Sequence, residues 1–220
     1  MNLFSGTGLT CMRGGRMVFA GLDFSIGSGR ALLLTGPNGS GKSSLLRLMS
    51  GLAQPVAGSV TWNGEAIDDE PDQHASRLHY VGHLDAVKPS LTVAENLAAW
   101  VELRGAGGDM ARGYVEGGLS RFGLLALADM PARLLSAGQR RRLALARIAA
   151  APANLWLLDE PTVALDRASV AALEAAVAAH LDGGGIVVLS SNVDVGLIDP
   201  VVLRIDDFTS VDDSHMDGVA

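Results

Sequence analysis

The chain has 220 residues, of which 48% are hydrophobic and 5% aromatic, and it carries a net charge of -7. This length and composition suit one globular α/β domain with a sizeable apolar core, and they exclude a disordered or fibrous chain. The negative charge gives no broad basic surface for a nucleic-acid backbone, so we expect no nucleic-acid partner. The one cysteine, Cys11, has no partner for an internal disulfide, and we interpret it as a core residue.

No stretch of the sequence approaches the roughly 18 uncharged apolar residues that a membrane-spanning helix needs. The first residues also lack a basic start followed by an apolar run and a cleavage site. We therefore expect a protein that is soluble or held at a membrane by other subunits. Such a protein cannot conduct a substrate across a bilayer alone.

The first third of the chain has strand character around one helix. Residues 17–26 and the apolar run 31–35 predict two strands separated by a turn at 27–29. Residues 43–50 then have helical spacing and end at Gly51. Residues 58–67 predict a short strand and a turn at residues 63 and 64, which together suggest an antiparallel edge.

Residues 92–151 read as almost wholly helical, with interruptions at 107–108, at 117–118 and at Pro131. Strand 154–160, helix 167–182 and strand 183–192 follow, in the alternation typical of a parallel sheet, and Trp156 reads as core. We predict one α/β domain with a core lobe, an inserted helical lobe and an acidic tail. Their expected residues are 1–91 and 152–206 for the core lobe, 92–151 for the helical lobe and 207–220 for the tail.

Residues 36–43 read GPNGSGKS, between a predicted strand and a predicted helix. Glycines at these positions let backbone N–H groups turn around phosphate oxygens, and the helix end and Lys42 add positive charge, so the loop predicts ATP binding. The alternative, a glycine turn with a surface lysine, explains less of the pattern. Ser43 is expected to ligate Mg²⁺. The predicted nucleotide-binding residues here are Gly36, Pro37, Asn38, Gly39, Ser40, Gly41, Lys42, Ser43 and Ser44.

Asp159 and Glu160 follow the apolar run LWLL, at the carboxyl end of a strand where parallel sheets place their ligands. We expect Asp159 to hold Mg²⁺ directly or through water, and Glu160 to polarise the water that attacks the γ-phosphate. The alternative is that these acids cap the following helix.

Residues 135–139 read LSAGQ and are followed by RRRLALARIAAA. Ser136 and Gln139 have the spacing of a capping box, which places free N–H groups at a helix start. The segment resembles the signature of the ABC ATPases, whose P-loop fold it implies. The resemblance covers nearly the whole chain. It implies that Ser136, Gly138 and Gln139 bind the γ-phosphate held by the second subunit of a head-to-tail dimer, and we expect a homodimer.

The same resemblance implies that Asp166, in VALD, is a dimer contact. Residues 140–142 are three arginines, which suggest either a phospholipid-facing patch or, as we expect, a solvated helix face. His74, His79, His180 and His215 show no metal spacing and are expected at the surface.

Three positions depart from the family pattern. His83 stands where most members have a glutamine that senses Mg²⁺, and Asn192 stands where they have a histidine that contacts the γ-phosphate. Asn192 can hydrogen-bond but cannot carry a proton, so turnover is expected to be slow. Arg13 or Arg16 replaces the aromatic residue that stacks on adenine.

The segment VGHLDAVKPSLTVAENL, the small size and the LSAGQRRR run are similar to the ATP-binding subunits of bacterial haem exporters in cytochrome c maturation. This similarity implies integral membrane partners, indirect membrane association at the cytoplasmic face of the inner membrane, and ATP hydrolysis coupled to haem handling or release of a haem chaperone. The alternatives are the ATPase of another small exporter, for a drug or a lipid, and a non-transport ABC ATPase of DNA repair or translation.

Overall fold

The computed structural model describes residues 1–209 apart from 106, 192 and 194. Its first sheet is antiparallel and four-stranded, in the order β2-β1-β4-β5. The hairpin between β1 and β2 turns at Gly14 and Gly15, whose positive φ angles of 57° and 79° favour glycine. The strands are β1 (Leu3–Arg13), β2 (Arg16–Gly27), β4 (Ala57–Trp62) and β5 (Glu65–Ala66).

The second sheet is parallel and five-stranded, in the order β6-β7-β8-β3-β9. Its central strands are buried on both faces, which explains their continuous apolar sequences. The strands are β3 (Ala31–Thr35), β6 (Leu78–Val81), β7 (Leu155–Asp159), β8 (Ile186–Ser190) and β9 (Val201–Arg204).

Alternation along β7 divides the core into two clusters. Leu155 and Leu157 pack with α1 (Lys42–Met49) and the antiparallel sheet, whereas Trp156 and Leu158 pack with the helices on the other face. Cys11 and Trp156 are both buried, at 8% and 5% exposure, so their assignment to the core is confirmed. Each face of the parallel sheet is therefore covered, and the sheet positions loops only at its ends.

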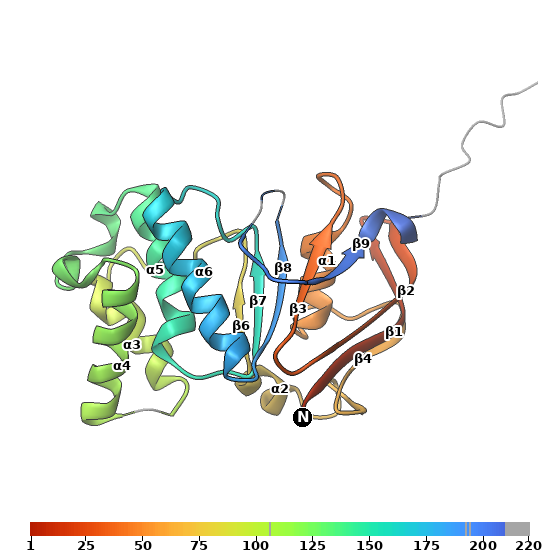
Figure 1. Ribbon diagram of the computed structural model, residues 1–220, viewed down its shortest axis with the longest axis horizontal. Helices are drawn as coiled ribbons and strands as arrows, with labels where there is room; N and C mark the ends of the chain where they lie inside the picture. The colour runs from red at the N-terminus through yellow and green to blue at the C-terminus, as the bar shows by residue number, and fades with distance from the viewer. Residues whose placement is uncertain (106, 192, 194, 210–220) are drawn as a thin grey trace, which may run out of the picture.

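Three helices, α3, α4 and α5, lie together at one end of the molecule, away from the antiparallel sheet (Figure 1). Helix α1 packs between the two sheets, and α6 packs against the other face of the parallel sheet. The helices are α1 (Lys42–Met49), α2 (Pro71–Arg77), α3 (Val93–Glu102), α4 (Gly108–Arg121), α5 (Ala137–Ala150) and α6 (Arg167–Asp182), with 3-10 turns η1 (Leu125–Leu127), η2 (Ala132–Leu134) and η3 (Ile205–Phe208).

The predicted fold class is confirmed, as are the strands and helices predicted from residues 17–67 and 154–190. The predicted interruption at residues 117–118 is wrong, because both glycines lie inside α4. A Cβ on Gly118 would lie 2.9 Å from the Ala146 carbonyl oxygen and 2.9 Å from Ala150 Cβ. Gly118 therefore allows α4 to pack closely on α5 rather than ending the helix.

The start of the predicted tail also differs from the structure. Residues 207 and 208 belong to η3, and Phe208 packs against the core cluster beside the antiparallel sheet. The apolar Ile205 and Phe208 anchor this turn despite the neighbouring acids. The rest of the predicted tail, residues 210–220, lies outside the described residues.

Candidate active site

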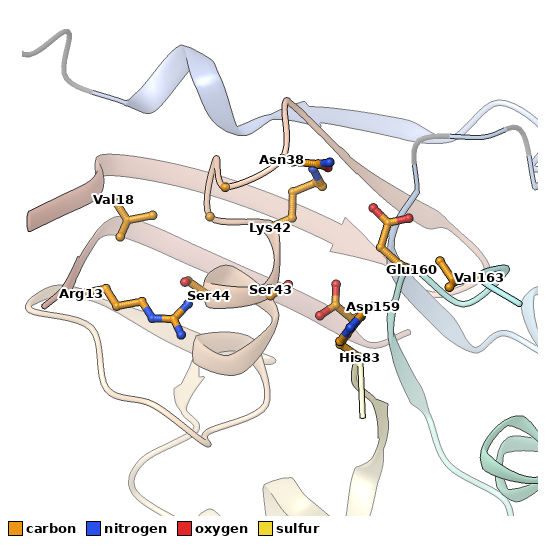
Figure 2. A pocket seen from close by; sticks show the side chains of 12 residues that line it. Arg13, Val18, Asn38, Lys42, Ser43, Ser44, His83, Asp159, Glu160 and Val163 are labelled. Carbon is orange, nitrogen blue, oxygen red and sulfur yellow. The ribbon is translucent and has the colours of Figure 1, made fainter. Parts of the chain in front are cut away.

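The site forms where four neighbouring parallel strands end. In the order β6, β7, β8 and β3, their carboxyl ends lead to His83, to Asp159 and Glu160, to Ser190 and to the glycine loop. Because neighbouring parallel strands end at the same edge of a sheet, residues far apart in sequence meet there. Residues at or after the ends of β6, β7 and β3, but not Ser190 itself, line a cavity of about 500 Å³, shown in Figure 2. Its lining is Arg13, Val18, Asn38, Gly39, Gly41, Lys42, Ser43, Ser44, His83, Asp159, Glu160 and Val163.

The glycine loop joins β3 to α1 through left-handed backbone. Gly36, Gly39 and Gly41 have φ angles of 138°, 86° and 108°, which residues with a side chain rarely adopt. A Cβ on Gly41 would also lie 2.5 Å from Val18 Cγ1. Glycine is thus required at position 41 both by conformation and by space, and α1 begins at the next residue, one position before the predicted segment 43–50.

Lys42 is 7% exposed and folds back along this loop. Its Nζ donates to the carbonyl oxygens of Gly36 at 2.7 Å and Pro37 at 3.1 Å. The Ser40 N–H closes a turn by donating to Pro37 O at 3.1 Å. Gly36, Pro37 and Ser40 therefore shape the loop without lining the cavity, whereas Asn38, Ser43 and Ser44 line it.

Asp159 and Glu160 share Ser190 as a partner. The Ser190 hydroxyl donates to Asp159 Oδ1 at 2.8 Å and accepts from the Glu160 N–H at 3.0 Å. Asp159 is 3% exposed. Glu160 has a φ of 45°, in a region that costs a residue with a side chain free energy and persists where the surroundings fix it. The neighbouring strand β8 therefore holds both acids at the end of β7.

The alternative role of these acids as helix caps is wrong. The residue that caps α6 is Asp166, which accepts from the Ser169 N–H at 2.8 Å. Hydrogen bonds from the Ser169 side chain and backbone lower the pKa of the Asp166 carboxyl. Asp159 and Glu160 face the cavity instead (Figure 2).

The predicted capping box is present at the start of α5. Gln139 N–H donates to Ser136 Oγ at 3.2 Å, and Ser136 N–H donates to Gln139 Oε1 at 2.8 Å. Gly138 lies against the segment before α6, because a Cβ there would be 2.9 Å from the Ala164 carbonyl oxygen. Ser136, Gly138 and Gln139 do not line the cavity of this chain, and neither does Asp166.

Arg141 is a site residue that the sequence analysis missed. The expected solvated face is wrong for this arginine, as is the phospholipid patch, because Arg141 is 4% exposed. Its Nη2 donates to the carbonyl oxygens of Asp159 and Glu160, both at 2.9 Å. A run of three arginines gave no signal that the middle one points inward, and only the contact with β7 reveals it.

The other predicted site residues have different outcomes. His83 and Arg13 both line the cavity, and Arg16 does not. Asn192 lies outside the described residues. The roles assigned to His83, Arg13 and Asn192 stay predictions.

The expected surface position is wrong for two histidines. His74 is 1% exposed and its Nε2 donates to Met49 O at 2.9 Å. His79 is 2% exposed and its Nε2 donates to Ala151 O at 2.9 Å. Each buried ring has its N–H group satisfied by a backbone carbonyl, which offsets the cost of burying a polar group. His215 lies outside the described residues.

None of the helices that the structure describes has both the length and the hydropathy needed to span a bilayer.

Comparison with known proteins assigns the chain to a family. Residues 19–163 match the family model described as ABC transporter. The "Cytochrome c biogenesis ATP-binding export protein CcmA" of Paramagnetospirillum magneticum is 55% identical over 93% of this chain and 94% of its own length. The protein of the same name from Rhodospirillum rubrum is 54% identical over 94% of this chain and 87% of its own.

A solved structure has the same fold. The ATP-binding protein of an ABC transporter from Pyrococcus furiosus superposes with a TM-score of 0.81 at 24% identity, covering 94% of this chain and all of the other. The family match, the identity to relatives over most of their length and the glycine loop facing two carboxylates agree with one another. The chain therefore belongs to the ABC transporter family, as an ATP-binding and ATP-hydrolysing subunit.

Proposed function

We propose that the chain hydrolyses ATP through Glu160, with the phosphates held in the glycine loop, as the motor of an exporter that serves cytochrome c biogenesis. The observation that carries the catalytic part is that the glycine loop, Asp159 and Glu160 line one cavity. The assignment to cytochrome c biogenesis rests on relatives that are 55% and 54% identical and carry that name.

The glycine loop, residues 36–43, and the start of α1 are proposed to bind the phosphates. Three left-handed glycines turn the backbone, and the helix N-terminus adds partial positive charge. The Lys42 ammonium, which now contacts the loop carbonyls, is the full charge within reach of the β and γ phosphates. Lys42 is thus assigned to binding rather than to proton transfer.

Ser43 and Asp159 would hold Mg²⁺. A hydroxyl and a carboxylate are the hard oxygen donors that this ion prefers, and both residues line the cavity. The Ser190 hydroxyl fixes one Asp159 oxygen, which orients the carboxylate. The ion would supply positive charge that offsets the charge of the phosphates.

Glu160 is assigned to the attacking water, which it orients and whose proton it accepts. Its N–H donates to Ser190 Oγ and its carbonyl oxygen accepts from Arg141 Nη2, and both bonds hold the residue in position. His83, on the neighbouring strand end, and Asn192 are proposed to contact the phosphates or the water beside it. Arg13 is proposed to stack its planar guanidinium on the adenine at the opposite side of the cavity.

The second copy of the chain is proposed to complete the site. Ser136, Gly138 and Gln139 form a helix start whose N–H groups suit an anion, yet they are outside this chain's own cavity. In a head-to-tail dimer they would meet the γ-phosphate bound by the partner subunit, with Asp166 at the contact. ABC ATP-binding subunits work with membrane subunits, and the dimer would drive those subunits.

We further propose that residues 92–151 form the helical lobe, and residues 1–91 and 152–206 the core lobe. The complex would be peripheral to the cytoplasmic face of the inner membrane, with integral membrane partners and ATP use coupled to haem handling. A strain lacking this gene, complemented with wild type or Glu160→Gln, tests this assignment. Holocytochrome c should be restored by wild type only; restoration by Glu160→Gln, or no requirement for the gene, would favour another exporter.

The separation of binding from hydrolysis is tested with two variants. Lys42→Ala should abolish binding of labelled ATP, because the phosphates lose their offsetting charge. Glu160→Gln should bind ATP like wild type and lose at least about a hundredfold in turnover. Equal loss of affinity in both variants would contradict these separate roles.

A further inference from the structure

Arg141 uses every hydrogen-bond donor of its guanidinium inside the protein. Nη2 donates to Asp159 O and Glu160 O, Nη1 to Gly82 O at 2.9 Å and to Asp85 Oδ1 at 3.2 Å, and Nε to Pro161 O at 3.4 Å. A guanidinium has five N–H donors in a fixed plane. Each donor here has its own acceptor, which fixes the side chain far more tightly than a single ion pair would.

The acceptors belong to two segments of the site. Three are successive carbonyls, those of residues 159, 160 and 161, at the end of β7. The other two come from the loop after β6, on either side of His83. Arg141 thus fixes the main chain around both the proposed water-orienting acid and the histidine that lines the same cavity.

The arginine itself comes from a third segment. It lies in the second turn of α5, two residues after Gln139 of the capping box. The start of α5 therefore carries two groups close together. One is the backbone that would meet a partner's γ-phosphate, and the other is the Arg141 side chain, which donates to the Glu160 carbonyl. A displacement of the start of α5 would move the carbonyl of Glu160 with it.

The contact of Arg141 with the Glu160 carbonyl matters because Glu160 has an unfavourable backbone conformation. The Glu160 N–H donates to Ser190, and the Glu160 carbonyl accepts from Arg141 and, at 3.3 Å, from the Val163 N–H, so these bonds hold its φ of 45°. With Arg141 removed, the charged donor to the Glu160 carbonyl is gone, and an unfavourable conformation loses one of its restraints. The Glu160 carboxylate would then sample positions from which it cannot orient the water, and a misplacement of about 1 Å can cost about a hundredfold in rate.

We infer that Arg141 is a positioning residue for ATP hydrolysis, which couples the phosphate-binding start of α5 to the placement of Glu160 and His83. This inference rests on the proposed function of Glu160. It assigns Arg141 no contact with ATP. Its loss should therefore lower kcat while leaving the affinity for ATP nearly unchanged.

The test compares Arg141→Met, Arg141→Lys and a matched control, Arg142→Met. Arg142 is the next residue of α5, but its Nη1 donates to Phe122 O at 3.2 Å, directly after α4, rather than to the carbonyls at the end of β7. In the chain assembled with its membrane partners, Arg141→Met should lower kcat per bound ATP by about thirtyfold, with KM within about threefold. Arg142→Met should stay within about twofold of wild type.

Arg141→Lys separates positioning from folding. A lysine keeps the charge that pairs with Asp85 but presents one nitrogen, so it cannot reach both segments. It should fold and show an intermediate loss, about tenfold in kcat at unchanged KM. If the Met variant does not fold, the Lys variant decides: wild-type kcat in Arg141→Lys would overturn the inference.

A double-mutant cycle with Glu160→Gln tests the route of the effect. If Arg141 acts through Glu160, adding Arg141→Met to Glu160→Gln should lower single-turnover hydrolysis by less than about twofold. A full additional loss would overturn the inference and indicate a merely structural role. Full activity of Glu160→Gln itself would refute the proposed function and this inference together, whereas an inactive Glu160→Gln with an active Arg141→Met would refute only the inference.

Discussion

Ser190 Oγ lies between the two acids of the site, donating to Asp159 Oδ1 at 2.8 Å and accepting from the Glu160 N–H at 3.0 Å. Ser190 is fully buried. One hydroxyl on β8 therefore orients the residue proposed to hold Mg²⁺ and the backbone of the residue proposed to orient water. The two carboxylates are adjacent in sequence, yet a third residue from another strand sets their relative position.

Ser190→Ala should consequently reduce activity through both acids. We expect about a tenfold lower kcat and a higher Mg²⁺ concentration for half-maximal activity, because the Asp159 carboxylate loses the bond that orients it. Ser191→Ala is the control, since the Ser191 hydroxyl bonds to Val193 backbone rather than to the acids. Mg²⁺ titrations of ATP hydrolysis measure the effect. An unchanged Mg²⁺ requirement in Ser190→Ala would contradict the orienting role.

Ser136→Arg should separate ATP binding from dimer formation. The large arginine side chain would fill the start of α5, where the partner's phosphate is proposed to bind. Residue 136 does not line the cavity that is proposed to bind ATP in the same chain. In a Glu160→Gln background, gel filtration with ATP should show a dimer when Ser136 is intact and a monomer when it is replaced. Affinity for labelled ATP should remain near wild type. A dimer both with Ser136 intact and with Ser136→Arg would rule out this role for Ser136.

His79 should make stability depend on pH. Burial, the largest cause, lowers the pKa of His79 to about 3, so the ring stays neutral in the folded chain, with Nε2–H donating to Ala151 O. The unfolded chain takes up the proton near pH 6.5. Stability is therefore lost as the pH falls from about 6.5 toward 3, by about 2 kcal/mol between pH 7 and pH 5.

The comparison that isolates this ring is with His79→Gln, which retains a donor for Ala151 O. Urea unfolding at pH 7 and pH 5 should show the wild type losing about 2 kcal/mol more than the variant. His74 and His180, whose pKa values are also lowered mainly by burial, are common to both proteins and cancel in the comparison. Identical losses would mean that His79 does not govern the acid sensitivity.

The site was predictable from sequence where its residues are contiguous. The glycine loop, Lys42 and Ser43 form one continuous motif, and Asp159 and Glu160 end one strand. These elements carry their own local signals, namely left-handed glycines and an apolar run that stops at two acids. The structure brings both into the same cavity, as the alternation of strands and helices suggested.

Residues whose roles depend on tertiary contacts have no local sequence pattern that predicts those roles. Arg141 resembles its neighbours in sequence, and its inward direction depends on carbonyls about 20 and 60 positions away. Strand β6 is four residues long and β9 is an exposed edge, so neither produces a clear pattern. β1 was also missed, because Gly6 and Gly8 and its register shifts interrupt the alternation that marks a strand.

Neighbouring glycines in α4 provide a stability test with its own internal control. Gly117 is exposed, with no atom within 4 Å of an added Cβ, whereas the Cβ of an alanine at 118 would lie 2.9 Å from Ala146 O. Gly117→Ala should stabilise the chain by about 0.5–1 kcal/mol, because alanine loses less backbone entropy in a helix. Gly118→Ala should destabilise it by about 1–3 kcal/mol, because α4 must move away from α5.

Urea unfolding of both variants measures the difference, and the two changes should have opposite signs. The ATP affinity of Gly117→Ala should match wild type, since the substitution is far from the glycine loop. Movement of α4 in Gly118→Ala would be transmitted to α5, which carries Ser136 and Arg141. Stabilisation by both substitutions would show that the α4 and α5 contact yields to an added methyl group, and that Gly118 is not required for their close packing.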